Sequence, residues 1–431
     1  MSEPQYVPLG SVLLPPISGK RPSGGVSSDT DGVPSIGGEN ILSSGGMTYE
    51  ELKRIPYSFF KFMPKGRLLR DDVLINKDGA QTGKVGIYEG DFEEAAVNEH
   101  VFILRTRDPN YLNQRYLYYC VLLPETRNKI EKRITGSAQP GLNSQFVKAV
   151  DVPLQPLSKQ QKIAAILSGV DTAIEKTEAL IAKYQQIKAG LMHDLFTRGV
   201  LPNGKLRPPR EQAPELYQET AIGWIPKEWQ YELLDKLALR GSGHTPNKNF
   251  PEYWNGGIKW VSLADSHRLD QLYISDTELQ ISHKGIQNSS AVLHPAGIVV
   301  LSRDAGVGKS AITTEPMAVS QHFMCWKCDQ KMDNHFLYYW LQFNKRTFEN
   351  IAMGSTILTI GLPYFKKMKI ACPVDLEEQQ NIAAKMKSAD TRIFSLQDEL
   401  SKLKQQKQGL MHDLLTGEVP VKVEEPEVVD G

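Results

Sequence analysis

The chain contains one long segment that occurs twice. Residues 157–200 recur without a gap at 376–419, and roughly 20 of about 44 aligned positions are identical. The run Gly-Leu-Met-His-Asp-Leu is present in both copies, at 190–195 and at 409–414. Each copy follows a more divergent stretch of about 150 residues, and so long a period indicates a pair of domains and not a solenoid.

Apolar residues in both copies step by four and three, which keeps one narrow stripe of a helix facing a partner helix. No proline interrupts either run. The pattern predicts two helices, 157–197 and 376–416, with a coiled-coil seam formed by Ile163, Leu167, Val170, Ile174, Ile181, Tyr184, Leu191 and Leu195 in the first copy and by Ile382, Met386, Ile393, Leu396, Leu400, Leu403, Leu410 and Leu414 in the second.

Lys188 and Lys407 occupy the same seam position in the two copies. A polar seam residue costs stability but fixes register, so this coincidence favours pairing of the two helices with each other. Two separate partner helices would show the same pattern.

Helices of this length are close to 60 Å long, at about 1.5 Å per residue. A parallel pair would require residues 198–221 to span that length again, at about 3.3 Å per residue. We therefore expect antiparallel helices. Residues 198–221 are expected to form an exposed linker, because they combine charges with four prolines, Pro202, Pro208, Pro209 and Pro214.

Composition indicates an ordinary globular chain. Its 431 residues and 40% hydrophobic content fit two or three domains, and no apolar run approaches the roughly 20 residues that span a bilayer. Four scattered cysteines and the lack of a signal segment favour a reducing cytoplasm. Fifty basic residues balance 50 acidic ones, so any nucleic-acid site must be local. The acidic tail, 417–431, is expected to be disordered.

The stretches before the helices, 1–156 and 222–375, resemble each other faintly. Residues 74–84 align with 299–309, 96–100 with 318–322, and 116–119 with 336–339. Both stretches combine short β-branched runs, glycine-rich turns and one helical segment. This combination predicts two α/β domains (mixed α+β), each with a mixed sheet.

These features together resemble the specificity subunit of a type I restriction-modification system. The resemblance rests on two variable modules, each followed by a near-identical helix ending in Gly-Leu-Met-His-Asp-Leu, and on the junction Gly-Trp-Ile-Pro-Lys-Glu-Trp at 223–229, and it covers essentially the whole chain. It implies a non-catalytic subunit whose modules are target recognition domains. Each domain would read one half of a bipartite, asymmetric double-stranded DNA target.

The resemblance also implies partners. The helices would set the spacing between the domains and dock two methyltransferase subunits, and restriction and translocase subunits would join that core. S-adenosylmethionine, and ATP with magnesium, would then bind to those partners and not to this chain, which would act in the cytoplasm without a membrane. Two related but non-identical modules fit two different half-sites, where an identical pair would require a palindrome. The alternatives are a coiled-coil adaptor whose end domains bind proteins, and a stand-alone nucleotide-dependent enzyme.

Patterns typical of catalysis are incomplete. The sequence Gly308-Lys309-Ser310 ends like a phosphate-binding loop, but Arg303 stands where that motif has glycine, so a strand-turn-strand is the better interpretation. Cys325 and Cys328 lack the second ligand pair of a zinc site. His193 and Asp194 are adjacent in a helix and cannot face each other. No Asn-Pro-Pro-Tyr or Asn-Pro-Pro-Phe motif of adenine methyltransferases is present. We expect neither catalytic nor metal-binding residues.

Candidate DNA-contacting residues lie in the aligned loops of the two modules. Basic residues suit phosphate or guanine, and amides and hydroxyls can reach base edges. Each of these residues, taken alone, is more often a solvated surface side chain, and their grouping in aligned loops of both modules favours DNA contact. The candidates for phosphate or guanine are Lys65, Arg67, Arg70 and Lys84 in the first module and Arg303, Lys309, Lys366 and Lys367 in the second, and the candidates for base edges are Gln139, Asn143 and Thr356.

Overall fold

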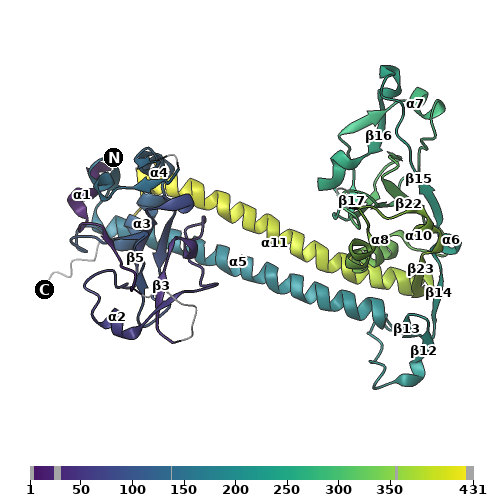
Figure 1. The fold of residues 1–431 in the computed structure, drawn as a ribbon, viewed down its shortest axis with the longest axis horizontal. Coiled ribbons are helices and arrows are strands. Elements are labelled where there is room, and N and C mark those ends of the chain that lie inside the picture. Colours follow the sequence, from purple (N-terminus) through teal and green to yellow (C-terminus); the bar gives the residue numbers. More distant parts are fainter. Residues whose placement is uncertain (1–3, 24–30, 137, 355–357, 424–431) are drawn as a thin grey trace. The chain divides into compact units, whose positions relative to one another are not determined.

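The computed structural model describes residues 4–23, 31–136, 138–354 and 358–423. The chain forms two units (Figure 1), one of Met1–Glu178 with Asp398–Gly431 and one of Ala179–Gln397. Each unit contains one α/β domain and a stretch of each of two long helices. These helices are α5, Leu157–Thr197, and α11, Leu376–Thr416, and each has 41 residues. Gly199 and Gly417, just beyond the helix ends, adopt positive φ values of 64° and 76°, the backbone conformation that commonly ends a helix.

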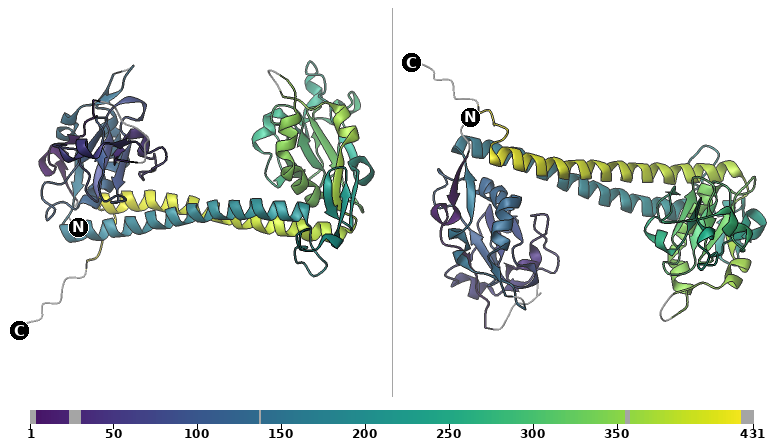
Figure 2. Two further views of the ribbon diagram at one scale, coloured as in Figure 1. Left: turned by 60° about the horizontal axis from the view of Figure 1, so that its bottom comes forward. Right: turned by 90° about the horizontal axis from the view of Figure 1, so that it is seen from above.

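The two long helices lie side by side in opposite directions within each unit (Figure 2). In the first unit Asp171 pairs with Lys407 at 2.6 Å, and Glu178 pairs with Lys404 at 2.7 Å. In the second unit the Arg392 guanidinium lies 5.5 Å from the Tyr184 ring centroid. Residue numbers rise along one helix as they fall along the other, which confirms the antiparallel pairing. Every seam residue named above is buried or partly buried.

The first domain is built on a buried main sheet whose strand pairs are all antiparallel, and the mixed pairing that was expected occurs in its smaller sheet. The run Asp72–Asn76 is apolar between its ends and forms a central strand that is buried along its whole length. Among the described residues the sheet order is β2-β8-β5-β6, with a smaller sheet β4-β3-β7 in which β3 and β7 are parallel. The elements are β1 (Gln5–Pro8), α1 (Leu9–Val12), β2 (Ile17–Ser18), β3 (Val33–Ile36), β4 (Arg54–Ile55), α2 (Tyr57–Lys61), β5 (Asp72–Asn76), β6 (Val85–Tyr88), β7 (Ala96–Val97), β8 (Val101–Leu104), α3 (Gln114–Leu122), α4 (Pro124–Glu131), β9 (Ile134–Thr135), β10 (Gly141–Leu142) and β11 (Asp151–Leu154).

The second domain repeats this plan with one more strand. Its main sheet has the order β15-β22-β19-β20-β17 in the described part of the chain, beside a smaller sheet β18-β16-β21. The parallel pair β16 and β21 matches the pair β3 and β7 of the first domain. The elements are β12 (Tyr217–Thr220), β13 (Gly223–Pro226), β14 (Trp229–Leu233), α6 (Leu234–Leu237), β15 (Leu239–Ser242), β16 (Trp254–Val261), β17 (Tyr273–Ile274), β18 (Leu279–Ile281), α7 (His283–Gln287), β19 (Val299–Ser302), β20 (Ser310–Thr313), β21 (Ala318–Val319), β22 (Phe323–Lys327), α8 (Asn334–Phe343), α9 (Lys345–Ile351), α10 (Leu362–Lys367) and β23 (Lys369–Pro373).

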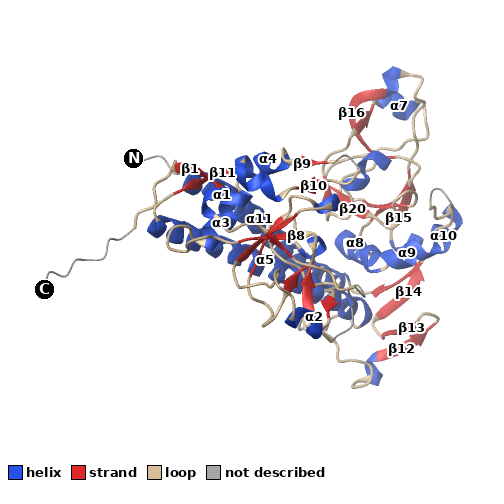
Figure 3. Cartoon of the chain, turned by 60° about the vertical axis from the view of Figure 1, so that its left-hand side comes forward, coloured by secondary structure: helices blue, strands red, loops and turns tan. Residues whose placement is uncertain are grey.

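Equivalent helices, α3 and α8, begin in the same way. Asn113 accepts a hydrogen bond from Tyr116 N at 3.0 Å, and Asp333 accepts one from Phe336 N at 2.8 Å, so each N-cap side chain satisfies an unpaired helix N–H. Both domains combine helices and strands (Figure 3), which confirms the mixed α/β class.

The hydrophobic core of each domain includes residues of both long helices. In the first unit, Ile163 and Leu167 of α5 and Leu414 of α11 belong to the core of the first domain. In the second unit, Leu195 of α5 and Ile382 of α11 belong to the core of the second domain. The long helices are therefore parts of the two domain cores and not appended rods.

The expected exposed linker at 198–221 is wrong in part. Val200 and Arg207 are 1% and 2% exposed, and β12 and β13 form a hairpin that begins inside this segment. Arg207 is buried because it pairs with Glu378 of α11. The tail also starts with ordered residues, since Val419 N donates to Asp413 O at 3.1 Å, while residues 424–431 lie outside the described residues.

Candidate functional site

Polar side chains gather where β5 ends beside the start of β8 in the first domain. These strands are antiparallel, with Asn76 opposite Val101, so the residues after β5 lie next to those before β8. Lys77 N donates to His100 O at 2.8 Å. We call the resulting cluster the first polar edge and define it as Arg21, Lys77, Asp78, Glu99 and His100.

Ion pairs connect the first polar edge from end to end. Arg21 Nε lies 3.1 Å from Glu99 Oε1, and that oxygen lies 3.3 Å from His100 Nε2. The other ring nitrogen, His100 Nδ1, lies 3.2 Å from Asp78 Oδ2, which is also 3.4 Å from Lys77 Nζ. Polar contacts therefore run through the cluster without a break, from Arg21 to Lys77, and hold its side chains in fixed positions.

The second domain has the same arrangement at the corresponding strand ends. The second polar edge consists of Thr245, Arg303, Asp304, Gln321 and His322. Thr245 Oγ1 donates to Gln321 Oε1 at 2.5 Å, and Gln321 Nε2 lies 3.3 Å from His322 Nε2. His322 Nδ1 lies 2.7 Å from Asp304 Oδ2, and Arg303 N donates to His322 O at 3.0 Å.

A loop from later in the chain packs on each edge. In the first domain Gly79 N donates to Pro140 O at 2.9 Å, which brings the loop before β10 against the edge. In the second domain Ala305 N donates to Leu358 O at 3.3 Å, and Ile360 N donates to Arg303 O at 2.9 Å. Each edge therefore combines a strand-end turn, a second strand end and one neighbouring loop.

The two edges share a framework and differ in chemistry. An aspartate and a histidine occupy equivalent places in both, as do Lys77 and Arg303. The remaining pair is a salt bridge, Arg21 with Glu99, in the first domain and an uncharged pair, Thr245 with Gln321, in the second. Two surfaces of this kind present different hydrogen-bond donors and acceptors to whatever they contact.

Of the six predicted residues of the first domain, the structure brings three, Lys84, Gln139 and Asn143, to the segments that form the polar edge. Lys84 ends the turn after Asp78, and the loop residues Gln139 and Asn143 flank the segment that bonds to Gly79 and Lys77. Gln139 is exposed, and Asn143 Oδ1 accepts from Gln145 N at 2.9 Å. Arg70 instead precedes β5, so it lies at the opposite end of that strand from the edge.

Lys65 and Arg67 are exposed on either side of Gly66, whose carbonyl accepts from Val97 N at 2.8 Å. Arg67 is also engaged in the fold, because its Nη2 donates to Phe60 O at 2.9 Å.

In the second domain two of the four predicted basic residues donate hydrogen bonds to backbone carbonyls of the same domain. Arg303 Nε donates to Ile360 O at 3.0 Å, and Lys309 Nζ donates to Ser266 O at 3.0 Å. Lys366 and Lys367 are exposed in the last turn of α10. Thr356 lies outside the described residues.

Of the ten residues that define the two polar edges, sequence reasoning named only Arg303. The missed residues include the four that differ between the domains, Arg21, Glu99, Thr245 and Gln321. Glu99 and Gln321 were visible as an aligned pair that differs in charge. Arg21 and Thr245 are far away in the sequence, and only the pairing of β2 with β8 and of β15 with β22 brings their segments to the edge.

Two of the patterns that resemble catalytic or metal sites belong to the main sheet of the second domain. Residues 303–309 form the turn of an antiparallel hairpin, β19 with β20, as the strand-turn-strand interpretation predicted. Burial raises the pKa of the Cys325 thiol to about 12, so it stays protonated. No group of three or more His, Cys, Asp or Glu side chains that could hold a metal ion occurs among the described residues.

No helix within the described ranges has the length and apolar composition that crossing a bilayer requires.

Comparison with known proteins agrees with this architecture. The family model for the type I restriction modification DNA specificity domain matches residues 1–186 and 226–405. The putative type I restriction enzyme MjaX specificity subunit of Methanocaldococcus jannaschii is 27% identical over 83% of this chain and 80% of its own length. The type I restriction enzyme MjaVIII specificity subunit of the same organism is 25% identical over 94% of this chain and 91% of its own length.

A solved structure has a similar fold. The S subunit of a type I restriction-modification system from M. genitalium superposes with a TM-score of 0.60 at 13% identity, and the match covers 97% of this chain and 96% of that one.

Two α/β domains with one framework and different surface chemistry are typical of a protein that recognises two different DNA sequences. The chain belongs to the family of type I restriction-modification DNA specificity subunits, and its two specificity domains match recognition of a bipartite DNA sequence.

Proposed function

We propose that each polar edge faces double-stranded DNA, so that each domain reads one half of an asymmetric target. The observation that carries this proposal is the common framework of the two edges with different polar groups on it, Arg21 and Glu99 in one and Thr245 and Gln321 in the other. Direct readout depends on the pattern of donors and acceptors that a protein presents to base edges. Different patterns on equivalent surfaces suit two different half-sites.

The paired helices would set the spacing between the half-sites and dock two methyltransferase subunits. A helix of 41 residues is about 60 Å long at about 1.5 Å per residue, which exceeds one turn of DNA at about 34 Å. Apolar side chains on the outer surface of the helix pair support docking, since Phe394 and Ile187 are 73% and 48% exposed. Exposed apolar side chains mark protein interaction sites where they form a contiguous patch.

The chain itself would be non-catalytic and would work in the cytoplasm. In this proposal the methyltransferase subunits bind S-adenosylmethionine, and restriction and translocase subunits bind ATP with magnesium. The hairpin turn at 303–309 supports the assignment of nucleotide binding to the partner subunits. Lys309 Nζ donates to Ser266 O, and the turn lacks the first glycine of a phosphate-binding loop.

The test is a comparison of genome methylation in cells with and without the gene. We expect one bipartite methylation motif to disappear when the gene is removed. Footprinting with the purified complex of this chain and its methyltransferase should then show two protected segments on a DNA that carries the motif. A complex that forms but protects no DNA would favour the coiled-coil adaptor instead.

A further inference from the structure

The two polar edges differ at one pair of positions that the fold places beside a constant Asp-His pair. We propose that Arg21 and Gln321 are base-reading residues, with Arg21 reading a guanine in one half-site and Gln321 reading an adenine in the other. This inference rests on the proposed function. It assigns the reading of DNA to one side chain on each polar edge and names the base that each side chain contacts.

Arg21 has the exposure and the support that guanine recognition requires. Its side chain is 44% exposed, and Nε lies 3.1 Å from Glu99 Oε1. The contact at Nε fixes the plane of the guanidinium while its terminal N–H groups still provide further donors. Arginine donates two parallel hydrogen bonds to O6 and N7 of guanine in the major groove, which is the commonest specific contact between proteins and DNA.

The acidic neighbours indicate that the first edge reads bases and does not only hold phosphates. Glu99 and Asp78 both belong to the edge, and their carboxylates would repel a phosphate placed directly against them. A base edge is uncharged, so it escapes this repulsion and can still accept from Arg21. Glu99 is therefore a positioning residue that orients Arg21 and His100.

Gln321 is oriented from both ends of its amide group. Its carbonyl oxygen accepts from Thr245 Oγ1 at 2.5 Å, and its Nε2 faces His322 Nε2 at 3.3 Å. Each end of an amide retains a second hydrogen-bonding position, and the side chain is exposed. Glutamine in this situation can pair with N6 and N7 of adenine.

The constant residues explain why these positions can vary. His100 and His322 are each held by an aspartate, Asp78 or Asp304, and each then contacts the variable residue with its other ring nitrogen. The aspartate and histidine provide the same support in both domains. Sequence readout can then change by exchange of the residues at the exposed end of the cluster.

The test is selection of preferred DNA by the complex of the full chain with its methyltransferase, from libraries randomised over one half-site at a time. The wild-type complex should select one bipartite sequence. Arg21→Ala should lose about ten- to hundred-fold discrimination at a single guanine position of one half-site and leave the other half-site unchanged. Gln321→Ala should have the same effect at a single adenine position of the other half-site.

Control variants separate the inference from general damage. Arg127→Ala removes a partly exposed arginine of α4 from the same domain and should leave both half-sites unchanged. Glu99→Gln keeps a side chain of the same size and should reduce discrimination at the position that Arg21 reads. Each variant complex is first checked for assembly with the methyltransferase and for its circular dichroism spectrum.

The possible failures are distinguishable. A wild-type complex that selects no bipartite sequence would overturn the proposed function itself. If the wild type selects a sequence but Arg21→Ala and Gln321→Ala weaken binding equally on all sequences, or change nothing, the two side chains do not read bases and the inference fails.

Discussion

At the scale of single residues, a buried carboxylate joins three separate parts of the second unit. Glu378, in the first turn of α11, accepts from Val200 N at 3.1 Å, from Arg207 Nη2 at 2.8 Å and from Trp229 Nε1 at 3.0 Å. The side chains of Arg207 and Glu378 are 3% and 9% exposed. The aligned residue of the first helix is Lys159, so this junction belongs to one unit alone.

Replacement of Glu378 should strongly destabilise the second unit. Glu378→Ala removes the buried carboxylate that faces the Arg207 guanidinium and leaves the exposed Glu228, 3.4 Å away, as its remaining ion-pair partner. The loss of the buried pair and of the bonds from Val200 N and Trp229 Nε1 is expected to cost about 3–5 kcal/mol of unfolding free energy. Denaturation by urea, followed by tryptophan fluorescence, measures this loss. Glu377→Ala, at the exposed neighbouring position, is the matched control and should change the free energy by less than about 0.5 kcal/mol.

Two aligned lysines should differ in their effect on DNA binding. Lys84 is partly exposed, whereas Lys309 Nζ already donates to Ser266 O. Lys84→Ala should lower the slope of log binding constant against log salt by about one unit, as the loss of one phosphate contact does. Lys309→Ala should lower this slope by less than one unit, because the Lys309 ammonium already has a partner within the domain. An unchanged slope for Lys84→Ala, measured with the methyltransferase complex, would remove Lys84 from the phosphate contacts.

At the scale of elements, a lysine, an aspartate and a tyrosine attach each domain to the helix pair in the same way. In the first unit Asp171 pairs with Lys407 and accepts from Tyr119 Oη at 2.8 Å. In the second unit Asp390 pairs with Lys188 and accepts from Tyr339 Oη at 2.9 Å. Burial raises the pKa of both tyrosines above the usual value, so their hydroxyl groups stay protonated and donate.

Disruption of one such triad should loosen one domain on its helices. Asp171→Asn keeps an acceptor for Tyr119 but loses the charge that faces Lys407, and we expect it to cost about 1.5–3 kcal/mol of unfolding free energy. The double variant Asp171→Lys with Lys407→Asp should recover part of that loss, because the ion pair is restored with reversed charges. If the double variant is less stable than Asp171→Lys alone and than Lys407→Asp alone, the two side chains have no attractive coupling.

The long helices could be predicted from the sequence, and the polar edges could not. A helix seam is a local pattern, so the spacing of residues such as Ile163 and Leu167 was sufficient. The edges depend on strands that pair across the domain, which places Arg21 beside Glu99 although no local pattern connects them. The same limit applies to Arg207, whose burial depends on a partner in α11.

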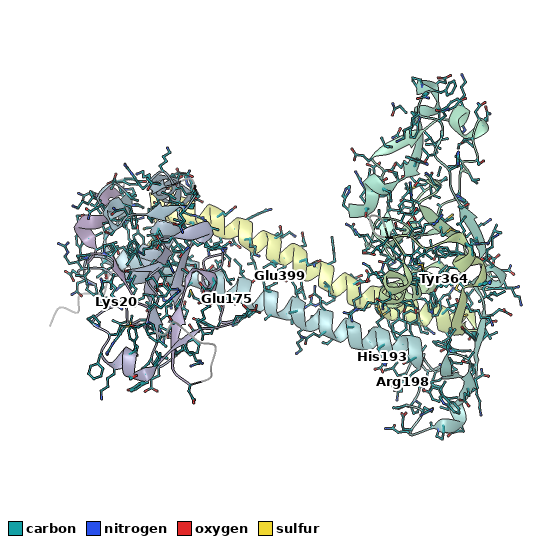
Figure 4. All side chains as sticks on the ribbon, viewed as in Figure 1. Lys20, Glu175, His193, Arg198, Tyr364 and Glu399 are labelled. Carbon is teal, nitrogen blue, oxygen red and sulfur yellow. The ribbon has the colours of Figure 1, made fainter. Side chains whose placement is uncertain are left out.

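At the scale of the whole molecule, the surface of the helix pair differs between the two repeats. Phe394 of α11 is 73% exposed, and its aligned residue in α5 is Glu175. Figure 4 labels Glu175 on α5 and also Lys20, which precedes Arg21 in the first domain. If apolar contacts contribute to the docking of methyltransferase subunits, α11 contributes an apolar side chain at a position where α5 has a charged one.

Replacement of Phe394 should therefore weaken assembly without harm to the fold. Phe394→Glu removes an exposed apolar group from the proposed docking surface, and we expect about a ten-fold loss of methyltransferase affinity with an unchanged melting temperature. Titration calorimetry of the purified subunits measures the affinity. Glu399→Ala, an exposed position of the same helix, is the control. Equal affinities for wild type and Phe394→Glu would place the methyltransferase elsewhere on the chain.

The core of the first domain includes Met411, Leu414 and Leu415, which lie near the end of α11. The ribosome makes these residues after the whole second domain. The first domain therefore cannot complete its hydrophobic core until translation is almost finished, and part of its apolar surface stays uncovered until then. A premature stop codon before Met411 would leave the first domain open to proteolysis, because its core never receives these three side chains.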